Sequence, residues 1–148
     1  MKVEIVNKTN KIIYEEELIV LMGCAEKVLR LPREVCVNIF FVGESEIKKL
    51  NHETRGINKI TDVLSFPIQD KNNYVKDVED NVVLGDIVIC PSYAMANVAK
   101  QGREVEKELN FLVLHGMLHL CGYDHNSDKE QVKMDKAGEE IIDFFVKL

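Results

Sequence analysis

The 148-residue chain has no tryptophan, three prolines, eight glycines and no long apolar segment. So few prolines and glycines exclude a linker-rich or collagen-like chain, and 46% hydrophobic with 30% charged residues is typical of one globular domain. The best apolar run, residues 18–25, has eight residues, whereas a membrane span needs about 20. Because the first residues do not read as a secretory signal, we expect a cytoplasmic protein without a membrane segment.

The cysteines are also few and far apart. Cys24, Cys36, Cys90 and Cys121 form no C-x-x-C pair. In a cytoplasmic protein such spacing favours free thiols over disulfide bonds. We therefore expect four reduced cysteines.

Positive charge is scarce in the second part of the chain. The formal net charge is −6, which disfavours non-specific nucleic-acid binding across the whole surface. Residues 1–60 hold 10 Lys and Arg against 9 Asp and Glu, a net of +1, which leaves −7 for residues 61–148. The first part therefore has room for a local basic patch, although such an asymmetry is more often ordinary surface solvation.

Hydrophobic periodicity predicts a mixture of strands and helices without regular alternation. Strands are expected over residues 1–7, 34–42, 63–66 and 82–90, and helices over 14–30, 44–52, 91–101, 103–120 and 128–148. Residues 54–61 are interpreted as a loop and residues 69–81 as a polar excursion. We predict a single α+β domain spanning residues 1–148, with a small mixed β-sheet of about four strands packed with about five helices.

Three of the four histidines fall within eleven residues, in the segment His115-Gly-Met-Leu-His119-Leu-Cys-Gly-Tyr-Asp-His125. On a helix, His115 and His119 lie on one face about a turn apart, and Gly122 can end the helix so that His125 approaches from a third direction. Three imidazoles with an open fourth position are typical of a catalytic zinc site. The alternative, histidines without a metal, is the better interpretation of a lone histidine but not of this set. Cys121 is expected as a packed thiol rather than a ligand.

The same spacing of histidines is found in metzincin proteases, with one difference. Those enzymes carry a glutamate directly after the first histidine as the general base. Here that position is Gly116, which argues against a peptidase.

Beyond the histidines, the motif and two further segments resemble one family. The string HGMLHLCGYDH at residues 115–125 matches the signature H-G-x-L-H-L-x-G-Y-D-H of the YbeY proteins, bacterial zinc-dependent endoribonucleases of ribosomal RNA maturation. The segments RGINKITDVLSFP at residues 55–67 and LGDIVI at residues 84–89 agree as well. The resemblance implies His115, His119 and His125 as ligands of one zinc ion (Zn²⁺) per chain, and Arg55 as the basic residue facing the metal cleft. It also implies a small mixed sheet with flanking helices.

Arg55 suits this chemistry on physical grounds. A phosphodiester under attack gains negative charge on its equatorial oxygens, which a planar guanidinium can bind through two donors. Lys48, Lys49 and Lys59 are candidates for steering the RNA backbone. Without the resemblance, a solvated loop with ordinary surface charges would be the favoured interpretation.

The roles of three aspartates are left open, and two other residues receive a structural interpretation. Asp62, Asp86 and Asp124 are candidates either for supporting a loop or for orienting an imidazole. His52 is expected on the surface, and Met134 in the core of the last helix rather than in a Met-turn.

The resemblance makes a single-strand-specific endoribonuclease of ribosomal RNA (16S rRNA 3′ end) maturation and ribosome quality control the leading hypothesis. Its expected partners are single-stranded RNA and the ribosomal small subunit or its assembly factors, with no membrane and no DNA. Two alternatives remain: a zinc hydrolase of another bond, such as a peptidase, and a ribosome-associated protein with a structural metal. The residues do not decide whether water or a 2′-hydroxyl is the nucleophile.

Overall fold

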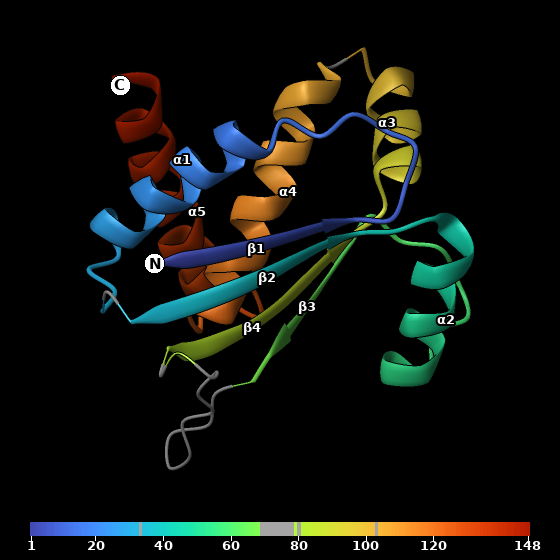
Figure 1. The fold of residues 1–148 in the computed structure, drawn as a ribbon, viewed down its shortest axis with the longest axis horizontal. Coiled ribbons are helices and arrows are strands. Elements are labelled where there is room, and N and C mark those ends of the chain that lie inside the picture. Colours follow the sequence, from blue (N-terminus) through green and yellow to red (C-terminus); the bar gives the residue numbers. More distant parts are fainter. Residues whose placement is uncertain (33, 69–78, 80, 103) are drawn as a thin grey trace.

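The structure is a computed structural model, and it describes residues 1–32, 34–68, 79, 81–102 and 104–148. Most of the predicted polar excursion at residues 69–81 lies outside the described residues. The elements run in the order β1 (Lys2–Asn7), α1 (Glu15–Val28), β2 (Val35–Phe41), α2 (Glu44–Arg55), β3 (Val63–Pro67), β4 (Val82–Ile89), α3 (Pro91–Lys100), α4 (Val105–Leu120) and α5 (Asp128–Val146). Figure 1 shows the strands as one twisted sheet with helices on both faces.

The four strands form a mixed sheet in the order β1-β2-β4-β3. The β1–β2 and β2–β4 pairs are parallel, and β3 joins the edge antiparallel to β4, with Val63 opposite Ile89 and Pro67 opposite Gly85. Proline at the end of an edge strand is tolerated because its missing N–H faces no partner strand. Together with the five helices in the described residues, this confirms the predicted α+β fold.

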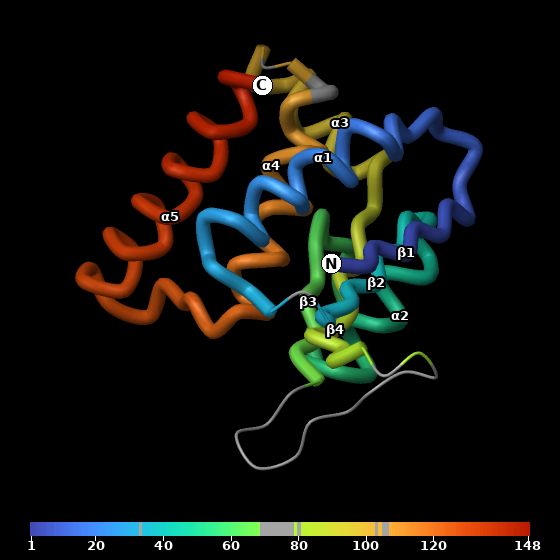
Figure 2. Tube along the Cα trace, turned by 60° about the vertical axis from the view of Figure 1, so that its left-hand side comes forward, coloured from blue at the N-terminus to red at the C-terminus, as the bar shows by residue number. Residues whose placement is uncertain are grey.

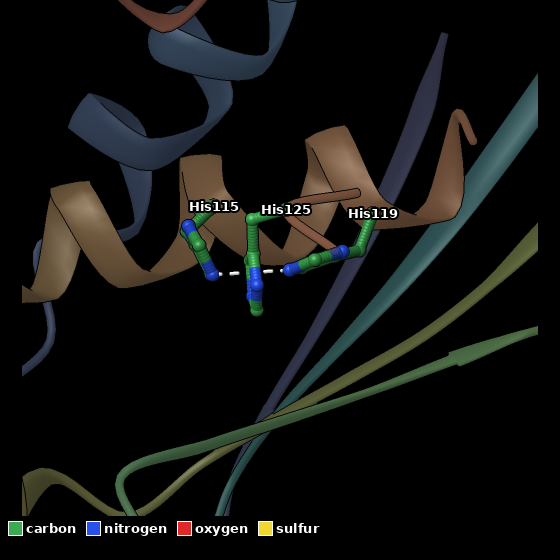
Figure 3. Close-up of side chains that lie close together, drawn as sticks. All are labelled: His115, His119 and His125. Atoms are coloured by element: carbon green, nitrogen blue, oxygen red, sulfur yellow. Dashed lines mark hydrogen bonds between the residues drawn. The ribbon is translucent and has the colours of Figure 1, made fainter. Parts of the chain in front are cut away.

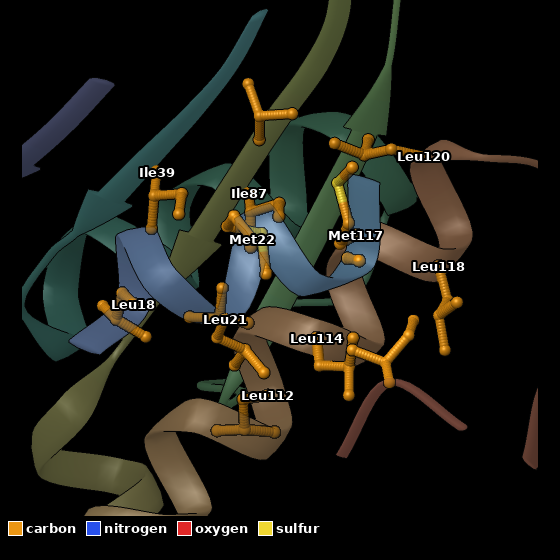
Figure 4. Packing of buried hydrophobic residues seen from close by; sticks show 14 of the residues in the cluster. Leu18, Leu21, Met22, Ile39, Ile87, Leu112, Leu114, Met117, Leu118 and Leu120 are labelled. Carbon is orange, nitrogen blue, oxygen red and sulfur yellow. The ribbon is translucent and has the colours of Figure 1, made fainter. Parts of the chain in front are cut away.

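Alternating side chains divide the sheet into two packed faces. Ile39 and Ile87 point toward α1 and α4, where they join the larger hydrophobic cluster with Leu21 and Met117 (Figure 4). On the opposite face, Val88 packs with other apolar side chains beneath α2. Figure 2 shows α5 outermost, beyond α1 and α4 on the side away from the strands.

Most predicted elements are confirmed to within a few residues, but α2 is longer than expected. The predicted helix ended at residue 52 and residues 54–61 were expected as a loop, whereas α2 continues to Arg55. The reason is Gly56, which adopts the left-handed conformation (φ 70°) that ends helices, so its N–H bonds the His52 carbonyl oxygen at 3.0 Å. Arg55 is therefore the last residue of a helix and not part of a loop.

None of the helices in the described part of the chain is long and apolar enough to cross a membrane. All four cysteines are free thiols in the structure, and all but Cys121 are buried. Met134 is buried in the core, as predicted, at 2% exposure. His52 lies on the exposed surface of α2, also as predicted.

Candidate metal centre

Helix α4 and the turn that follows it bring the three histidines together. His115 and His119 project from the same side of α4, one turn apart (Figure 3). At the end of the helix Gly122 adopts φ 95°, and the N–H groups of Gly122 and Tyr123 bond the carbonyl oxygens of His119 and Leu118 at 3.0 Å each. This turn reverses the chain and returns His125 to the same side.

The three imidazoles converge on one point. Each offers a ring nitrogen, and the three nitrogens all lie within 4.8 Å of one another. The Nε2 atoms of His115 and His119 are 3.0 Å apart, and the His125 ring centroid lies 5.9 Å from that of His115 and 5.2 Å from that of His119. Two nitrogens bound to one zinc ion at 2.0–2.1 Å in tetrahedral geometry would be about 3.3 Å apart. The donor set therefore fits a metal ion of this size.

Hydrogen bonding leaves His119 in the tautomer that a metal requires. Its Nδ1 lies 2.9 Å from the carbonyl oxygen of Tyr123. A carbonyl oxygen can only accept, so Nδ1 carries the proton and the Nε2 lone pair faces the other histidines. Burial, reinforced by the neighbouring charges of His119 and His125, lowers the pKa of His115 and favours its neutral form. The first effect orients His119 toward a cation, and the second favours a neutral His115 that can bind one.

The donor group contains no fourth His, Cys, Asp or Glu among the described residues. Cys121 lies outside it and packs against the hydrophobic core, and burial raises the pKa of its thiol to about 11. Such a thiol is protonated at neutral pH when no metal is bound, and its position outside the donor group separates Cys121 from the three ligands. Three protein ligands and an open position are the arrangement of a catalytic rather than a structural zinc site.

Gly116 has a steric role that the sequence did not reveal. A Cβ atom at this position would lie 2.8 Å from Cγ2 of Ile87 on β4, closer than packed carbon atoms approach. Glycine thus lets α4 approach the sheet. The glutamate that serves as the base in metzincins cannot occupy this position without moving the helix.

The opposite wall of the site comes from β3 and the end of α2. A cleft of about 540 Å³ is lined by the three histidines, by Val63, Ser65 and Pro67 of β3, and by Arg55. Arg55 is exposed and makes no hydrogen bond or ion pair with any residue that the structure describes. Its guanidinium is therefore available to an anion in the cleft, and the structure places it in the same cleft as the histidines.

A buried amide fixes the end of α2 beside Arg55. Asn51 is the one buried polar residue in the described part of the chain, with 4% exposure. Its side-chain Nδ2 donates to the carbonyl oxygen of Lys59 at 3.0 Å, and its backbone carbonyl oxygen accepts from the N–H of Ile57 at 3.4 Å. These bonds hold residues 56–59 against α2. Asn51 was not singled out from the sequence, where a single asparagine in a helix carries no distinctive signal.

The three aspartates whose roles the sequence did not decide have different surroundings. Asp62 accepts from the N–H of Val63 at 2.8 Å. Its negative charge acts to raise the pKa of His115, but the larger effects of burial and of the neighbouring histidines lower that pKa overall. Asp124 accepts from the N–H of His125 and from Nδ2 of Asn126, each at 2.8 Å, so it shapes the turn that carries His125. Asp86 accepts from Nδ2 of Asn38 on the sheet face under α2, away from the histidines. None of them bonds an imidazole nitrogen in the contacts seen here.

The candidate steering lysines lie on the outside of α2 and the following loop. Lys48, Lys49 and Lys59 are all exposed. The Lys49 ammonium is 3.9 Å from the carboxylate of Glu53, which partly neutralises it. Arg55 lines the cleft, whereas none of these three lysines does.

Comparisons with known proteins identify the family of the chain. The sequence model of the family described as endoribonuclease YbeY matches residues 3–146. Among curated proteins, the chain is 36% identical over 140 residues to "Endoribonuclease YbeY" of Clostridium botulinum (strain Alaska E43 / Type E3), covering 85% of this chain and 83% of that protein. It is 35% identical over 149 residues to "Endoribonuclease YbeY" of Syntrophomonas wolfei, covering 96% of each.

A solved structure shares the fold. The solution structure of TM1509 from Thermotoga maritima superimposes with a TM-score of 0.64 at 32% identity, covering 98% of this chain and 92% of that one. The family match spans nearly the whole chain and includes the histidine segment, Arg55 and β4. The chain belongs to the YbeY family of endoribonucleases.

Proposed function

We propose that this protein is a zinc-dependent endoribonuclease that cleaves single-stranded RNA in the cleft between α4 and β3. The observation that carries the proposal is the meeting, in a single cleft, of three imidazole donors and one guanidinium that has no partner among the described residues. Neither a metal ion nor an arginine at a phosphate reads base identity, so the arrangement suits cleavage governed by the backbone. Membership of a family named for this activity supports the same conclusion.

In this proposal the two walls of the cleft have different tasks. His115, His119 and His125 hold the ion, and the Tyr123 carbonyl keeps His119 oriented toward it. When bound, a zinc ion supplies Lewis-acid chemistry, because it polarises an oxygen of the phosphate and lowers the pKa of a coordinated water to about 7. Arg55 binds the non-bridging oxygens as negative charge accumulates on them.

The described lining of the cleft offers no obvious general base. Asp124 is the only carboxylate among the described residues that line the cleft, and its two oxygens already accept hydrogen bonds. Gly116 stands where a metzincin has its base. In this proposal the nucleophile's proton passes to a non-bridging phosphate oxygen and from there to the leaving oxygen as its P–O bond breaks, whether the nucleophile is water or the RNA's own 2′-hydroxyl.

The proposed biological setting is ribosomal RNA maturation in the cytoplasm, at the 3′ end of 16S rRNA, together with ribosome quality control. This part rests on the family. A protein with a net charge of −6 is expected to bind long RNA weakly by itself. Delivery by the ribosomal small subunit or an assembly factor would overcome this, and the proposal fails on this point if the isolated protein binds single-stranded RNA tightly at physiological salt.

Parallel incubations test the activity. Zinc-loaded protein is mixed with a single-stranded RNA, the same RNA in a duplex, and casein, each with and without a chelator. We expect cleavage of the single strand alone, abolished by chelation and restored by zinc. Casein cleavage would instead support the peptidase alternative. If none of the three substrates is cleaved although one zinc ion is bound per chain, the result would support a ribosome-associated protein whose metal is structural.

A further inference from the structure

A second concavity lies on the other side of the metal ligands, between α4 and α5. It has a volume of about 280 Å³ and is mainly apolar. Its inner surface is formed by buried side chains of the two helices, Leu114 and Leu118 from α4 and Met134 from α5. At its edge Phe111 is 54% exposed, on a helix that also supplies much of the core. We call this concavity the α4–α5 groove.

A glycine keeps the groove open. Gly138 lines it from the middle of α5, where glycine is a poor helix former. A Cβ atom at this position would lie 3.7 Å from Cδ1 of Leu118, which is an ordinary van der Waals contact. The packing of α5 on α4 therefore does not require glycine here, unlike the packing of α4 on the sheet at Gly116. Any larger side chain at position 138 would fill space that is now open.

Negative charges line one edge of the groove. Asp135, Glu139 and Asp143 follow one another at intervals of four residues along α5, so they lie on one face of the helix. Asp135 accepts a hydrogen bond from Gln131. Glu139 and Asp143 have no side-chain hydrogen bond or ion pair with any residue in the described ranges. An apolar groove with an unpaired acidic edge is complementary to a chain segment that presents apolar and basic side chains together.

We propose that the α4–α5 groove docks a cationic amphipathic segment of a partner protein. The apolar side chains of such a segment would pack against Phe111 and the buried floor, and its lysines or arginines would pair with Glu139 and Asp143. RNA is excluded as the occupant by the same charges, because its phosphates would face carboxylates. The proposal concerns a protein contact and does not depend on the nuclease activity.

The groove also borders the metal centre. His115 lines both the groove and the cleft, and the charge of Asp135 acts on His115. A docked partner would thus sit beside the ligand helix, adjoining the cleft at His115.

The test uses the zinc-loaded full chain, labelled with 15N, and a short synthetic helical peptide with leucines on one face and lysines on the other. A matched peptide has each lysine replaced by glutamate. We expect the lysine peptide to shift the amide signals of residues 111–118 and 134–143, and the glutamate peptide to leave them unchanged. Shifts confined to other surfaces, or equal shifts with a single-stranded RNA, would overturn the proposal.

Matched variants separate the groove from general acidity. Glu139→Lys should weaken binding of the lysine peptide about fivefold, as expected for reversing one rim charge. Glu140→Lys changes the same net charge on an adjacent exposed residue outside the groove and should have no effect. Gly138→Leu fills the groove and should abolish the amide shifts while the protein remains folded. Equal weakening by the two lysine variants would show that the peptide only senses overall charge, and would refute the proposed groove.

Discussion

The two walls of the cleft are built in different ways. The α4 wall carries His115 and His119 on a helix whose neighbouring residues Met117 and Leu118 are buried, at 0% and 3% exposure, and His125 on the turn that follows the helix. The opposite wall presents Arg55 from the exposed end of α2, where a single buried amide holds the following loop. The first wall is positioned by core packing and the second by a few local hydrogen bonds.

In the proposed function, this difference assigns metal binding to one wall of the cleft and substrate binding to the other. Metal ligands must lie within a few tenths of an ångström of their required positions, and a helix packed on the core provides such precision. A phosphate-binding arginine has a longer, more adaptable side chain and must remain open to solvent for RNA to enter. Substitutions on the α4 wall should therefore affect metal content or folding, and those on the α2 wall should affect catalysis with zinc retained.

The largest effect is expected on the α4 wall. His119→Ala removes the ligand between the other two in sequence, the one oriented by Tyr123. We expect zinc content well below one ion per chain and no RNA cleavage, measured by metal analysis of the purified protein and by an RNA assay. Cys121→Ser is the control and should retain its zinc. Full stoichiometric zinc in His119→Ala would refute the ligand assignment.

On the α2 wall, Arg55→Ala should keep the zinc and the fold but slow cleavage. Loss of one preorganised charge-stabilising donor lowers rates by about 10²–10³ in other enzymes, and we expect that scale here. Arg55→Lys should recover only part of the lost cleavage rate, since an ammonium cannot bind two phosphate oxygens in a planar fork.

Single-turnover cleavage with zinc measured in parallel checks the Arg55 prediction. RNA affinity should change far less than rate, because an interaction that strengthens in the transition state acts on rate. Wild-type cleavage by Arg55→Ala would remove Arg55 from the active site. A loss matched entirely by weaker RNA binding would make it a docking residue.

The contact between α4 and the sheet can be tested through stability. Gly116→Ala places a methyl group 2.8 Å from Cγ2 of Ile87, and overpacking of this kind costs about 1–3 kcal/mol. Chemical denaturation of the two proteins measures the difference. Gly23→Ala in α1 is the matched control, because a Cβ there meets nothing within 4 Å and should stabilise by about 0.4–1 kcal/mol. Equal effects at the two glycines would contradict the close approach of α4 to β4.

The smallest expected effect concerns Asn51, a positioning residue on the α2 wall. Asn51→Leu removes the bond to the Lys59 carbonyl oxygen and should loosen residues 56–59. We expect cleavage to fall about tenfold with zinc unchanged, because misplacing a catalytic group slightly has this scale of cost. Faster hydrogen exchange at the Ile57 amide would report the loosening.

The double variant Asn51→Leu/Arg55→Ala distinguishes positioning from general damage. If Asn51 acts through Arg55, the double variant should cleave no more slowly than Arg55→Ala alone. A further tenfold loss in the double variant would assign Asn51 a role independent of Arg55.

The sequence predicted the α4 wall better than the α2 wall, for a physical reason. Histidines four residues apart followed by a glycine turn form a local pattern, because helix periodicity and the left-handed preference of glycine act over short distances. The predicted loop at Arg55 was wrong because Gly56, a single helix-ending glycine, was not recognised as such a signal, although Arg55 does line the cleft.

Other features depend on contacts that no short pattern encodes. The Tyr123 carbonyl that orients His119 is a backbone atom, available at any residue. The need for glycine at position 116 arises from Ile87, which is 29 residues away in sequence and adjacent only in the folded sheet. Asp86 points away from the histidines because Ile87, its neighbour in β4, points toward α4, and a one-residue change in register would reverse both.

X-ray absorption at the zinc edge, measured on the zinc-loaded protein, tests the central claim most directly. The three histidines of the α4 wall predict a first shell of nitrogen and oxygen atoms at about 2.0–2.1 Å, with the outer-shell signature of three imidazoles. A sulfur atom at about 2.3 Å would identify a cysteine ligand. That result, or a signature of fewer than three imidazoles, would contradict the site as described.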